Sequence, residues 1–360
     1  MAISGRASKA PRPKPPNIYD VAREARVSVF TVSAVINHKQ HVRAPLKKRV
    51  EAAIQKLGYR PNSLAQSLAK EHTKILGIVV PDISNPFFPM VVRGAEDAAQ
   101  KDGYTVLLCN SDGLPQKEEE YLDLLIAKRV DGILLTKCPG EMSPRILRDL
   151  NELRIPTVMM MRTYPDLSEH AVVTDDLQAS YQAVSHLARI GHKKIALVGG
   201  PLSVSNGRER LQGFKKALKR YGLKYDPELV YEGDYRIDSG HTAGLSILPH
   251  RPDAVFVANF LMMVGFLQAA QELGMKSPEN FGLVALDDYP WLRLFNPPVT
   301  AVELPKYEVG KEAAELLLQC IQGKAPKAST HKIMPQIYVR ESCGFGLLTR
   351  TLGRAHAGDK

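Results

Sequence analysis

Residues 17–37 read NIYDVAREARVSVFTVSAVIN, and this stretch decides the fold of the amino-terminal part of the chain. Asn17 is a good helix cap with an acid three residues on, and apolar side chains recur at helical spacing through residues 18–25. Ser28 can cap a second helix over residues 29–36, whose apolar side chains share one face. Two short helices joined by a three-residue turn predict a helix-turn-helix.

A third helix is predicted from about Pro45 to Leu57. It has apolar side chains on one face and four cations on the other, and Gly58 then ends it. The three residues before this helix, Val42-Arg43-Ala44, include no Ser or Thr that could cap it, so we expect a loss of about 1 kcal/mol of capping energy. Pro45 suits the first turn. The apolar face of this helix closes a three-helix core.

The composition is typical of a globular chain of two or three domains, with 360 residues, 44% hydrophobic and 24% charged. Its longest apolar runs are far shorter than the ~18–20 residues that cross a bilayer, and its amino terminus lacks a signal-peptide pattern. We therefore expect a cytoplasmic, nucleoid-associated protein with no membrane segment. The four cysteines lie far apart, so we predict neither a metal site nor a disulfide framework, and we expect no cofactor.

The positive charge is concentrated at the amino end. The net charge is +10, and residues 1–80 hold 15 Lys and Arg against four Asp and Glu, so the rest of the chain carries −1. A short basic module ahead of a neutral body indicates a reader of polyanions, although charge alone fits a solvated basic tail equally well. We predict that residues 1–16 are a disordered basic arm and that residues 344–360 are a disordered tail.

From Lys74 onward, apolar runs of strand length alternate with amphipathic helical stretches, a pattern typical of βαβ units and parallel sheets. The predicted strands are 75–80, 104–109, 132–135, 157–161, 195–198, 254–257 and 282–286. The predicted helices include 88–101, 118–128, 179–190 and 210–221. This length suffices for two similar doubly wound halves. No glycine-rich phosphate motif is present, so nucleotide binding is not supported.

At these residues the sequence resembles the lac repressor/galactose repressor family of bacterial transcription regulators. The resemblance is carried by residues 17–37, by GYRPN at 58–62 and by Ala65-x-x-Leu68, and collectively by landmarks of the body such as VPDISNPFF at 80–88. It extends over about residues 17–343. It implies a small all-α helix-turn-helix DNA-binding domain plus an α/β two-lobed periplasmic-binding-protein-like domain with parallel sheets.

The resemblance also implies the domain boundaries and the partners. The helix-turn-helix domain is expected at 17–60, a hinge helix with its linker at 61–73, and an effector-binding and dimerisation domain at 74–343. The expected lobes are 74–174 with 304–332, and 175–303 with 333–343. The implied protein is a homodimeric repressor of a palindromic double-stranded DNA operator. A small-molecule effector, a sugar or other metabolite, is expected in the cleft between the lobes.

By this resemblance residues 29–36 form the recognition helix in the major groove, and a hinge helix at 62–69 pushes Leu68 into the minor groove. Without the resemblance, packing of Leu68 against the next domain would be the preferred interpretation. The residues expected to contact DNA are Ile18, Tyr19, Ser28, Val29, Phe30, Thr31, Ser33, Ala34, Asn37, Tyr59, Asn62, Ala65 and Leu68.

Two departures from the family pattern affect DNA binding. Arg26 stands where glycine is usual, so its side chain must tolerate a left-handed backbone or one close to it. Val29, Phe30 and Ala34 occupy the usual base-reading positions, and relatives commonly have an arginine in place of Ala34. Because none of these side chains is a strong hydrogen-bonding group, we expect sequence preference to rest on thymine methyl groups and DNA shape.

Ligands of open α/β folds bind beyond the carboxyl ends of the strands. The effector-binding residues expected there are Phe87, Phe88, Asp112, Arg210, Tyr235, Asn259 and Asp287. By position Arg210 would bind ligand oxygens, Asp287 would accept hydroxyl hydrogen bonds and Tyr235 would stack at the rim, while Asp112 fits a helix cap as well. Phe260 replaces an Asp that is common in relatives. This predicts a more apolar pocket, with a less hydroxylated ligand or a lost effector response.

Two other functions remain open. An enzyme is disfavoured because the histidines form no metal-ligand pattern and no nucleophile motif is present. An architectural DNA-binding protein, or a regulator that has lost its effector response, predicts that no small molecule changes DNA affinity. A regulator instead predicts a coupling of about 1–3 kcal/mol between ligand and operator.

Overall fold

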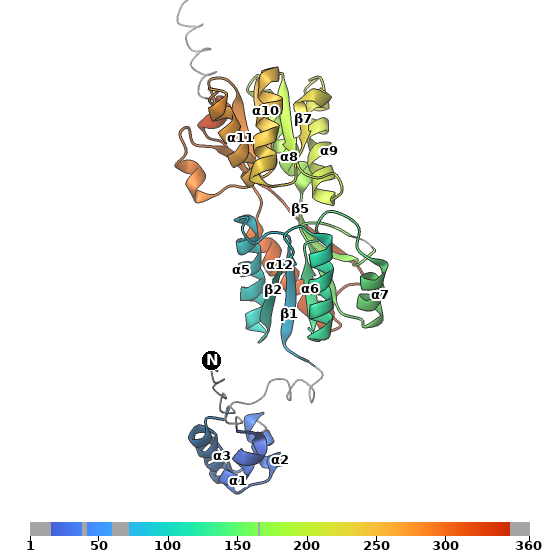
Figure 1. The fold of residues 1–360 in the computed structure, drawn as a ribbon, viewed down its shortest axis with the longest axis vertical. Coiled ribbons are helices and arrows are strands. Elements are labelled where there is room, and N and C mark those ends of the chain that lie inside the picture. The colour runs from blue at the N-terminus through green and yellow to red at the C-terminus, as the bar shows by residue number, and fades with distance from the viewer. Residues whose placement is uncertain (1–15, 38–41, 60–71, 165, 346–360) are drawn as a thin grey trace, which may run out of the picture. The chain divides into compact units, whose positions relative to one another are not determined.

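The computed structural model describes residues 16–37, 42–59, 72–164 and 166–345. They form two compact units, of which the first lies within residues 1–73 and the second begins at Lys74 (Figure 1). No helix in these described ranges is both long and apolar enough to span a bilayer.

The first unit is a three-helix domain built from α1 (Ile18–Ala25), α2 (Val29–Ile36) and α3 (Ala44–Leu57). Asn17 and Ser28 cap the first two helices with their side chains, as the sequence predicts. Val21, Val32 and Val50, one from each helix, are fully buried in a shared core. The predicted helix-turn-helix is confirmed.

A cation stabilises the turn between α1 and α2. Arg26 lies in the left-handed region at φ 51° and ψ 51°, as its place at a glycine position predicts. The Arg49 guanidinium donates to the carbonyl oxygens of Ala25 at 2.6 Å and of Arg26 at 3.1 Å. It therefore caps the carboxyl end of α1, where the helix dipole favours positive charge. Helix α3 begins at Ala44 without a side-chain cap, one residue before the predicted start, and ends at left-handed Gly58.

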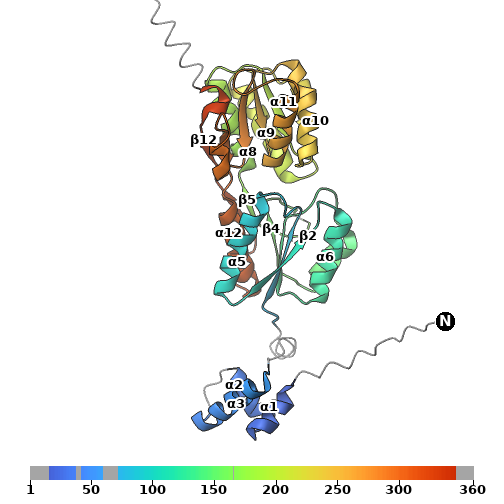
Figure 2. The ribbon, with the colours of Figure 1, turned by 60° about the vertical axis from the view of Figure 1, so that its left-hand side comes forward.

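The second unit has two lobes, each built around a six-stranded sheet (Figures 1 and 2). The first sheet is parallel throughout, in the order β11-β5-β4-β3-β1-β2. Its strands are β1 (Ile75–Val80), β2 (Thr105–Asn110), β3 (Gly132–Leu135), β4 (Thr157–Met160), β5 (His170–Thr174) and β11 (Ser329–Ile333). One face is covered by α5 (Phe87–Lys101) and α12 (Lys306–Ile321), and the other by α6 (Pro115–Ala127) and α7 (Pro144–Glu152).

The second sheet has the order β12-β10-β9-β8-β6-β7, and only β12 runs antiparallel to its neighbour. Its strands are β6 (Ile195–Gly199), β7 (Val230–Glu232), β8 (Ala254–Val257), β9 (Gly282–Leu286), β10 (Thr300–Glu303) and β12 (Gln336–Tyr338). One face packs against α8 (Asp176–Arg189) and α9 (Ser205–Arg220), and the other against α10 (Ile237–Ile247) and α11 (Phe260–Glu272). Short 3-10 turns lie at 227–229, 248–250, 290–293 and 341–343.

The chain passes between the lobes three times, after β5, after β10 and after β11. Strand β2 begins one residue later than predicted and β4 ends one residue earlier. Strands β5, β7, β10, β11 and β12 are additions to the predicted set. Strands β7 and β12 have three residues each, and β11 exposes polar side chains such as His331 and Lys332, so no apolar run marks these three in the sequence. Strands β5 and β10 do contain short buried apolar runs, which the prediction missed.

Helices α5 and α12 cross at two glycines. A Cβ atom at Gly310 would overlap the carbonyl oxygen of Val91, and one at Gly94 would overlap that of Tyr307. We therefore expect Gly310→Ala to lower the free energy of unfolding by about 1–3 kcal/mol, because the backbones must move apart. Urea unfolding followed by circular dichroism measures this. Glu315→Ala, at an exposed position of α12, is the control, and equal midpoints for the two variants would contradict the prediction.

Candidate functional site

The exposed surface of α2 combines one large ring with small hydroxyls. The Phe30 side chain is 76% exposed, and Tyr19 at the start of α1 is 66% exposed. The Thr31 hydroxyl lies 2.9 Å from the Ser28 hydroxyl, so these two groups partly satisfy each other. No arginine or glutamine lies within α2, so the helix offers the major groove an apolar ring and hydroxyl groups.

The other predicted DNA contacts are placed less uniformly. Ala34 is only 7% exposed and is one of the buried residues of α2, and its contact with DNA stays a prediction. Asn37 donates to the Ser33 carbonyl oxygen at 2.8 Å. Tyr59 packs on the core of the unit, and burial raises its pKa.

Val29, Ser33 and Ile18 are partly exposed. Asn62, Ala65 and Leu68 lie outside the described residues, as does most of the predicted hinge.

A cleft of about 630 Å³ opens between the two lobes of the second unit. All seven predicted effector-binding residues line it: Phe87, Phe88, Asp112, Arg210, Tyr235, Asn259 and Asp287. They follow different strands of both sheets, at the carboxyl ends, as the rule for open α/β folds predicts. Further lining residues that the sequence analysis did not single out include Thr136, Arg162, Asn206 and Arg236.

Arg210 on α9 forms a buried ion pair with Asp176, at the start of α8. Its Nε and Nη2 atoms both lie 2.7 Å from Asp176 Oδ1, and Nη1 donates to the Ala258 carbonyl oxygen at 2.7 Å. Burial disfavours the charged guanidinium, but Asp176 and other neighbouring anionic groups outweigh it, and the pKa of Arg210 is raised. A guanidinium has five N–H donors, so two remain for a ligand.

Asp287 supplies an unpaired carboxylate oxygen to the cleft. The residue follows β9 with φ 74° and is 3% exposed, and its Oδ1 atom has no hydrogen-bond partner among the residues that the structure describes. Burial raises its pKa, against the opposing effects of Lys306 and Arg210. A buried polar atom without a partner costs free energy, so this oxygen is suited to accept a hydrogen bond from a ligand.

Arg162 is a cleft residue that sequence reasoning missed. It is buried after β4, its Nη1 donates to the Lys137 carbonyl oxygen, and its Nε finds no partner within the described part of the chain. Behind it the buried Lys137 ammonium pairs with Glu118 at 3.0 Å. Burial lowers the pKa of Arg162, and the nearby Arg210 charge adds to this effect. Its place at the carboxyl end of a strand is the same signal that identified Asp287, and could have found it.

Tyr235 lies between the charged groups of the cleft. Its hydroxyl donates to Asn206 Oδ1 at 3.3 Å, and the guanidinium carbons of Arg162 and Arg210 lie 5.8 and 5.4 Å from its ring centre. The ring therefore contacts two cations, a favourable arrangement for an aromatic face. Burial raises the pKa of this phenol.

Several lining groups are already engaged by the protein. The Asn259 side chain caps α11 by accepting from the Met262 N–H at 3.1 Å. The Asp112 carboxylate pairs with Lys117, and its carbonyl oxygen accepts from Arg236 of the other lobe at 2.8 Å. Asp112 therefore joins the lobes at the mouth of the cleft.

The cleft is lined by polar and apolar groups together, and a pocket more apolar than that of relatives stays a prediction. Phe260, the first residue of α11, does not line the cleft. Its ring packs edge-on against Tyr289 and Trp291, with ring centres 4.8 and 6.1 Å away, and the Tyr289 and Trp291 rings stack on each other. Phe260 thus packs into this aromatic group, and Phe87 and Phe88 form the aromatic wall of the cleft.

Family models match the chain in two parts, and both describe one family. Residues 17–62 match bacterial regulatory proteins of the lacI family, and residues 73–342 match the periplasmic binding proteins and sugar binding domain of the LacI family. The chain belongs to the LacI family. Its members are DNA-binding transcription regulators with an effector-binding domain, and this chain is one of them.

Similar proteins agree with the family assignment. The transcriptional repressor CytR of Escherichia coli K12 is 33% identical over 90% of this chain and 95% of its own length. The structure of the Lac repressor dimer bound to operator and an anti-inducer has a TM-score of 0.80 and 27% identity, covering 92% of this chain and 99% of that one. The CelR regulator in complex with cellobiose has a TM-score of 0.70 and 31% identity, covering 91% and 99%.

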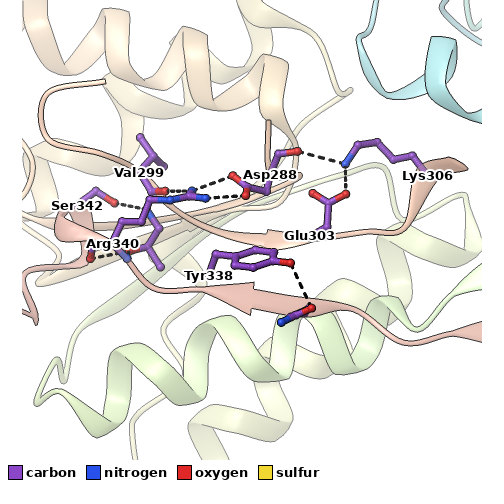
Figure 3. A network of polar contacts seen from close by, with 9 residues as sticks. Asp288, Val299, Glu303, Lys306, Tyr338, Arg340 and Ser342 are labelled. Atoms are coloured by element: carbon purple, nitrogen blue, oxygen red, sulfur yellow. Dashed lines mark hydrogen bonds and ion pairs between the residues drawn. The ribbon is translucent and has the colours of Figure 1, made fainter. Parts of the chain in front are cut away.

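A polar network at the lobe crossings holds the Asp287 segment of this LacI-family chain in place (Figure 3). Arg340, after β12, forms two hydrogen bonds with the carboxylate of Asp288, at 2.8 and 2.6 Å. The Lys306 ammonium at the start of α12 binds Glu303 Oε1 at 2.8 Å and the Asp288 carbonyl oxygen at 3.3 Å. Asp288, next to Asp287, is thus bonded to Lys306 in the segment that crosses between the lobes after β10, and to Arg340, which follows β12 in the second lobe.

Proposed function

We propose that this regulator is a repressor that binds a palindromic operator as a dimer and changes its operator affinity when a small hydroxylated ligand fills the cleft. The observation that carries the proposal is a set of buried polar atoms without partners around one interlobe cleft. These atoms are Asp287 Oδ1, Arg162 Nε and Thr136 Oγ1. Donors and acceptors in one cavity are suited to hydroxyl groups, which do both.

A sugar, or a metabolite that contains one, is the ligand class we infer. The related regulator CelR was solved with cellobiose, and the cleft of this chain is lined by polar groups together with Phe87 and Phe88. Asp287 would accept from ligand hydroxyls, and Arg210 and Arg162 would donate to ligand oxygens. Closure of the lobes on the ligand would then act through the Lys306 and Arg340 network.

The domain assignments follow from the same proposal. We assign residues 17–60 to DNA binding, 61–73 to the hinge and linker, and 74–343 to effector binding and dimerisation. The cleft binds its ligand without converting it, and steady turnover of a bound sugar would contradict this. A regulator of this kind acts in the cytoplasm, on the nucleoid.

Selection of bound sequences from a random DNA pool, repeated with a panel of sugars and nucleosides, tests the function. We expect a palindromic motif and at least one ligand that changes operator affinity by about 5–150-fold. A motif that no ligand affects would instead support an architectural protein or a regulator without effector response.

The exposed Phe30 ring gives a specific prediction for DNA reading. Apolar side chains in the major groove contact thymine methyl groups, so replacing half-site thymines by uracil should weaken wild-type binding several-fold. The variant Phe30→Ala should bind both duplexes equally. Fluorescence anisotropy with the four combinations measures this. If Phe30→Ala keeps the wild-type ratio of its affinities for the thymine and uracil duplexes, another side chain reads the methyl groups.

A further inference from the structure

One surface of the second lobe is strongly positive although the body as a whole is neutral. Residues 189–224 contain ten Lys and Arg and a single acid, Glu209. Among these cations, Arg210 is buried in its ion pair with Asp176. The single acid, Glu209, forms its ion pair with Lys332, outside this stretch, at 3.8 Å. Of the other nine cations of this stretch, five lie on α9, a helix on one flank of the second lobe (Figure 1).

The solvent-facing side of α9 consists entirely of long polar side chains. Every exposed residue of this helix is Arg, Lys or Gln: Arg208, Gln212, Lys215, Lys216, Lys219 and Arg220. None of these five cations forms an ion pair with a described residue. The helix dipole favours cations in the last turn, which accounts for Lys219 and Arg220, and Arg208 donates to the Leu202 carbonyl oxygen at 2.9 Å. Neither reason accounts for Lys215 and Lys216. Like charges four residues apart repel, so the helix is less stable for carrying them.

Neighbouring tyrosines hold some of these side chains in place. The Lys215 ammonium lies 4.6 Å from the centre of the Tyr225 ring, and that of Lys216 lies 5.6 Å from the centre of the Tyr181 ring. Arg189, at the end of α8, donates to the Tyr221 hydroxyl at 2.8 Å. Ordered cations lose less entropy when they bind an anion, so this arrangement favours a polyanionic partner.

The composition of the face distinguishes DNA from an acidic protein. Protein interfaces usually contain an apolar or aromatic anchor, and no exposed residue of α9 is apolar. Lys, Arg and Gln are instead the side chains that contact DNA phosphates without reading sequence. We propose that the exposed face of α9 binds the phosphate backbone of a second DNA duplex, independently of the helix-turn-helix. The protein then joins two DNA segments, without sequence preference at the second one.

The test uses the full-length protein with its helix-turn-helix already occupied. The protein is saturated with an unlabelled short operator duplex, and a labelled 30-base-pair non-operator duplex is titrated against it by fluorescence anisotropy at several salt concentrations. The variant K215Q/K216Q/K219Q/R220Q removes four charges from α9. The variant K101Q/K128Q/R154Q/K324Q removes four exposed charges from the first lobe and is the matched control.

We expect the wild type and the control to bind the second duplex with equal affinity and the α9 variant to bind at least 10-fold more weakly at low salt. The slope of log affinity against log salt should fall by about 3 to 4 in the α9 variant, since each phosphate contact contributes about 0.9. Equal losses in both variants would reduce the effect to net charge and overturn the proposal, as would equal binding by all three. Labelled polyglutamate is titrated in the same way. If it binds the wild type more tightly than the duplex does, and binds the α9 variant only weakly, the partner of this face is an acidic protein and not DNA.

Operator binding in the same samples, followed by gel mobility, separates this proposal from the proposed function. A failed operator complex would count against the repressor, while an intact complex that ignores the second duplex counts only against the α9 face. Equal thermal midpoints for the two variants establish that both are folded.

Discussion

Replacing Arg210 with methionine should lower the free energy of unfolding of the two-lobed unit by about 3–5 kcal/mol and abolish the effector response. The substitution leaves the Asp176 carboxylate, which is 1% exposed, with the Thr174 hydroxyl as its remaining hydrogen-bond donor. It also removes the donor to the Ala258 carbonyl oxygen. Breaking a buried ion pair from one side leaves an uncompensated charge, which is far more costly than losing the pair as a whole.

Thermal and urea unfolding measure the stability loss, and ligand titration measures the response. Lys332→Met is the matched control, because it breaks the more exposed pair with Glu209 and should cost less than about 1 kcal/mol. The double variant Asp176→Asn with Arg210→Met should recover part of the lost stability, since no charge then remains buried. An Arg210→Met protein with the wild-type unfolding midpoint would show that the ion pair contributes nothing to the fold.

The helices of the first unit could be predicted nearly to the residue because their ends are marked by local chemistry. Asn17 and Ser28 are caps whose hydrogen bonds are formed within one turn, and Gly58 ends α3 in the left-handed region that glycine favours. Arg49, in contrast, joins α3 to the end of α1 across more than twenty residues of chain. No local pattern marks such a contact.

The residues that line the cleft could be predicted where they follow a strand that is recognisable in the sequence. They could not be predicted where the direction of a side chain decides whether it reaches the cleft. Asp287 follows a buried apolar strand, so its position at the sheet edge follows from the topology. Phe260 is also next to a predicted site residue, but it turns towards Tyr289 and Trp291, which come from a distant loop. That packing depends on the fold, so the sequence could not show that Phe260 itself is absent from the pocket lining.

The ion pair of Arg210 is a third feature that could not be predicted from the sequence. Sequence analysis placed it at the ligand, and the structure places it in the cleft, but it also forms an ion pair with Asp176 from a separate helix. Its substitution therefore tests binding and stability together. A residue whose side chain has unused hydrogen-bonding capacity is the better test of the ligand site alone.

Asp287→Asn is that test, and we expect it to raise stability while reducing effector affinity by about 100-fold. The affinity loss follows because a ligand hydroxyl would lose a charged acceptor in a buried site, an interaction of about 1.5–3 kcal/mol. The stability gain has two causes. The buried Oδ1 atom has no partner in the free protein, and asparagine is neutral and tolerates the left-handed backbone at φ 74° well. The polar network around Asp288 does not use the Asp287 carboxylate, so it should survive.

The stability gained by Asp287→Asn should depend on pH, and the raised pKa of Asp287 sets the direction of that dependence. Because burial raises the pKa of Asp287 above its unfolded value of about 3.9, the folded state holds this proton more tightly than the unfolded state does. The carboxyl group therefore costs no stability at pH values below 3.9, costs more as the pH rises towards the folded pKa, and reaches its full cost above it. The gain in thermal midpoint from Asp287→Asn should accordingly be larger at pH 7.5 than at pH 4.5. A variant that is less stable than the wild type at pH 7.5 would mean that the ionised carboxylate stabilises the free protein, and Asp287 would then be a structural residue with no oxygen reserved for the ligand.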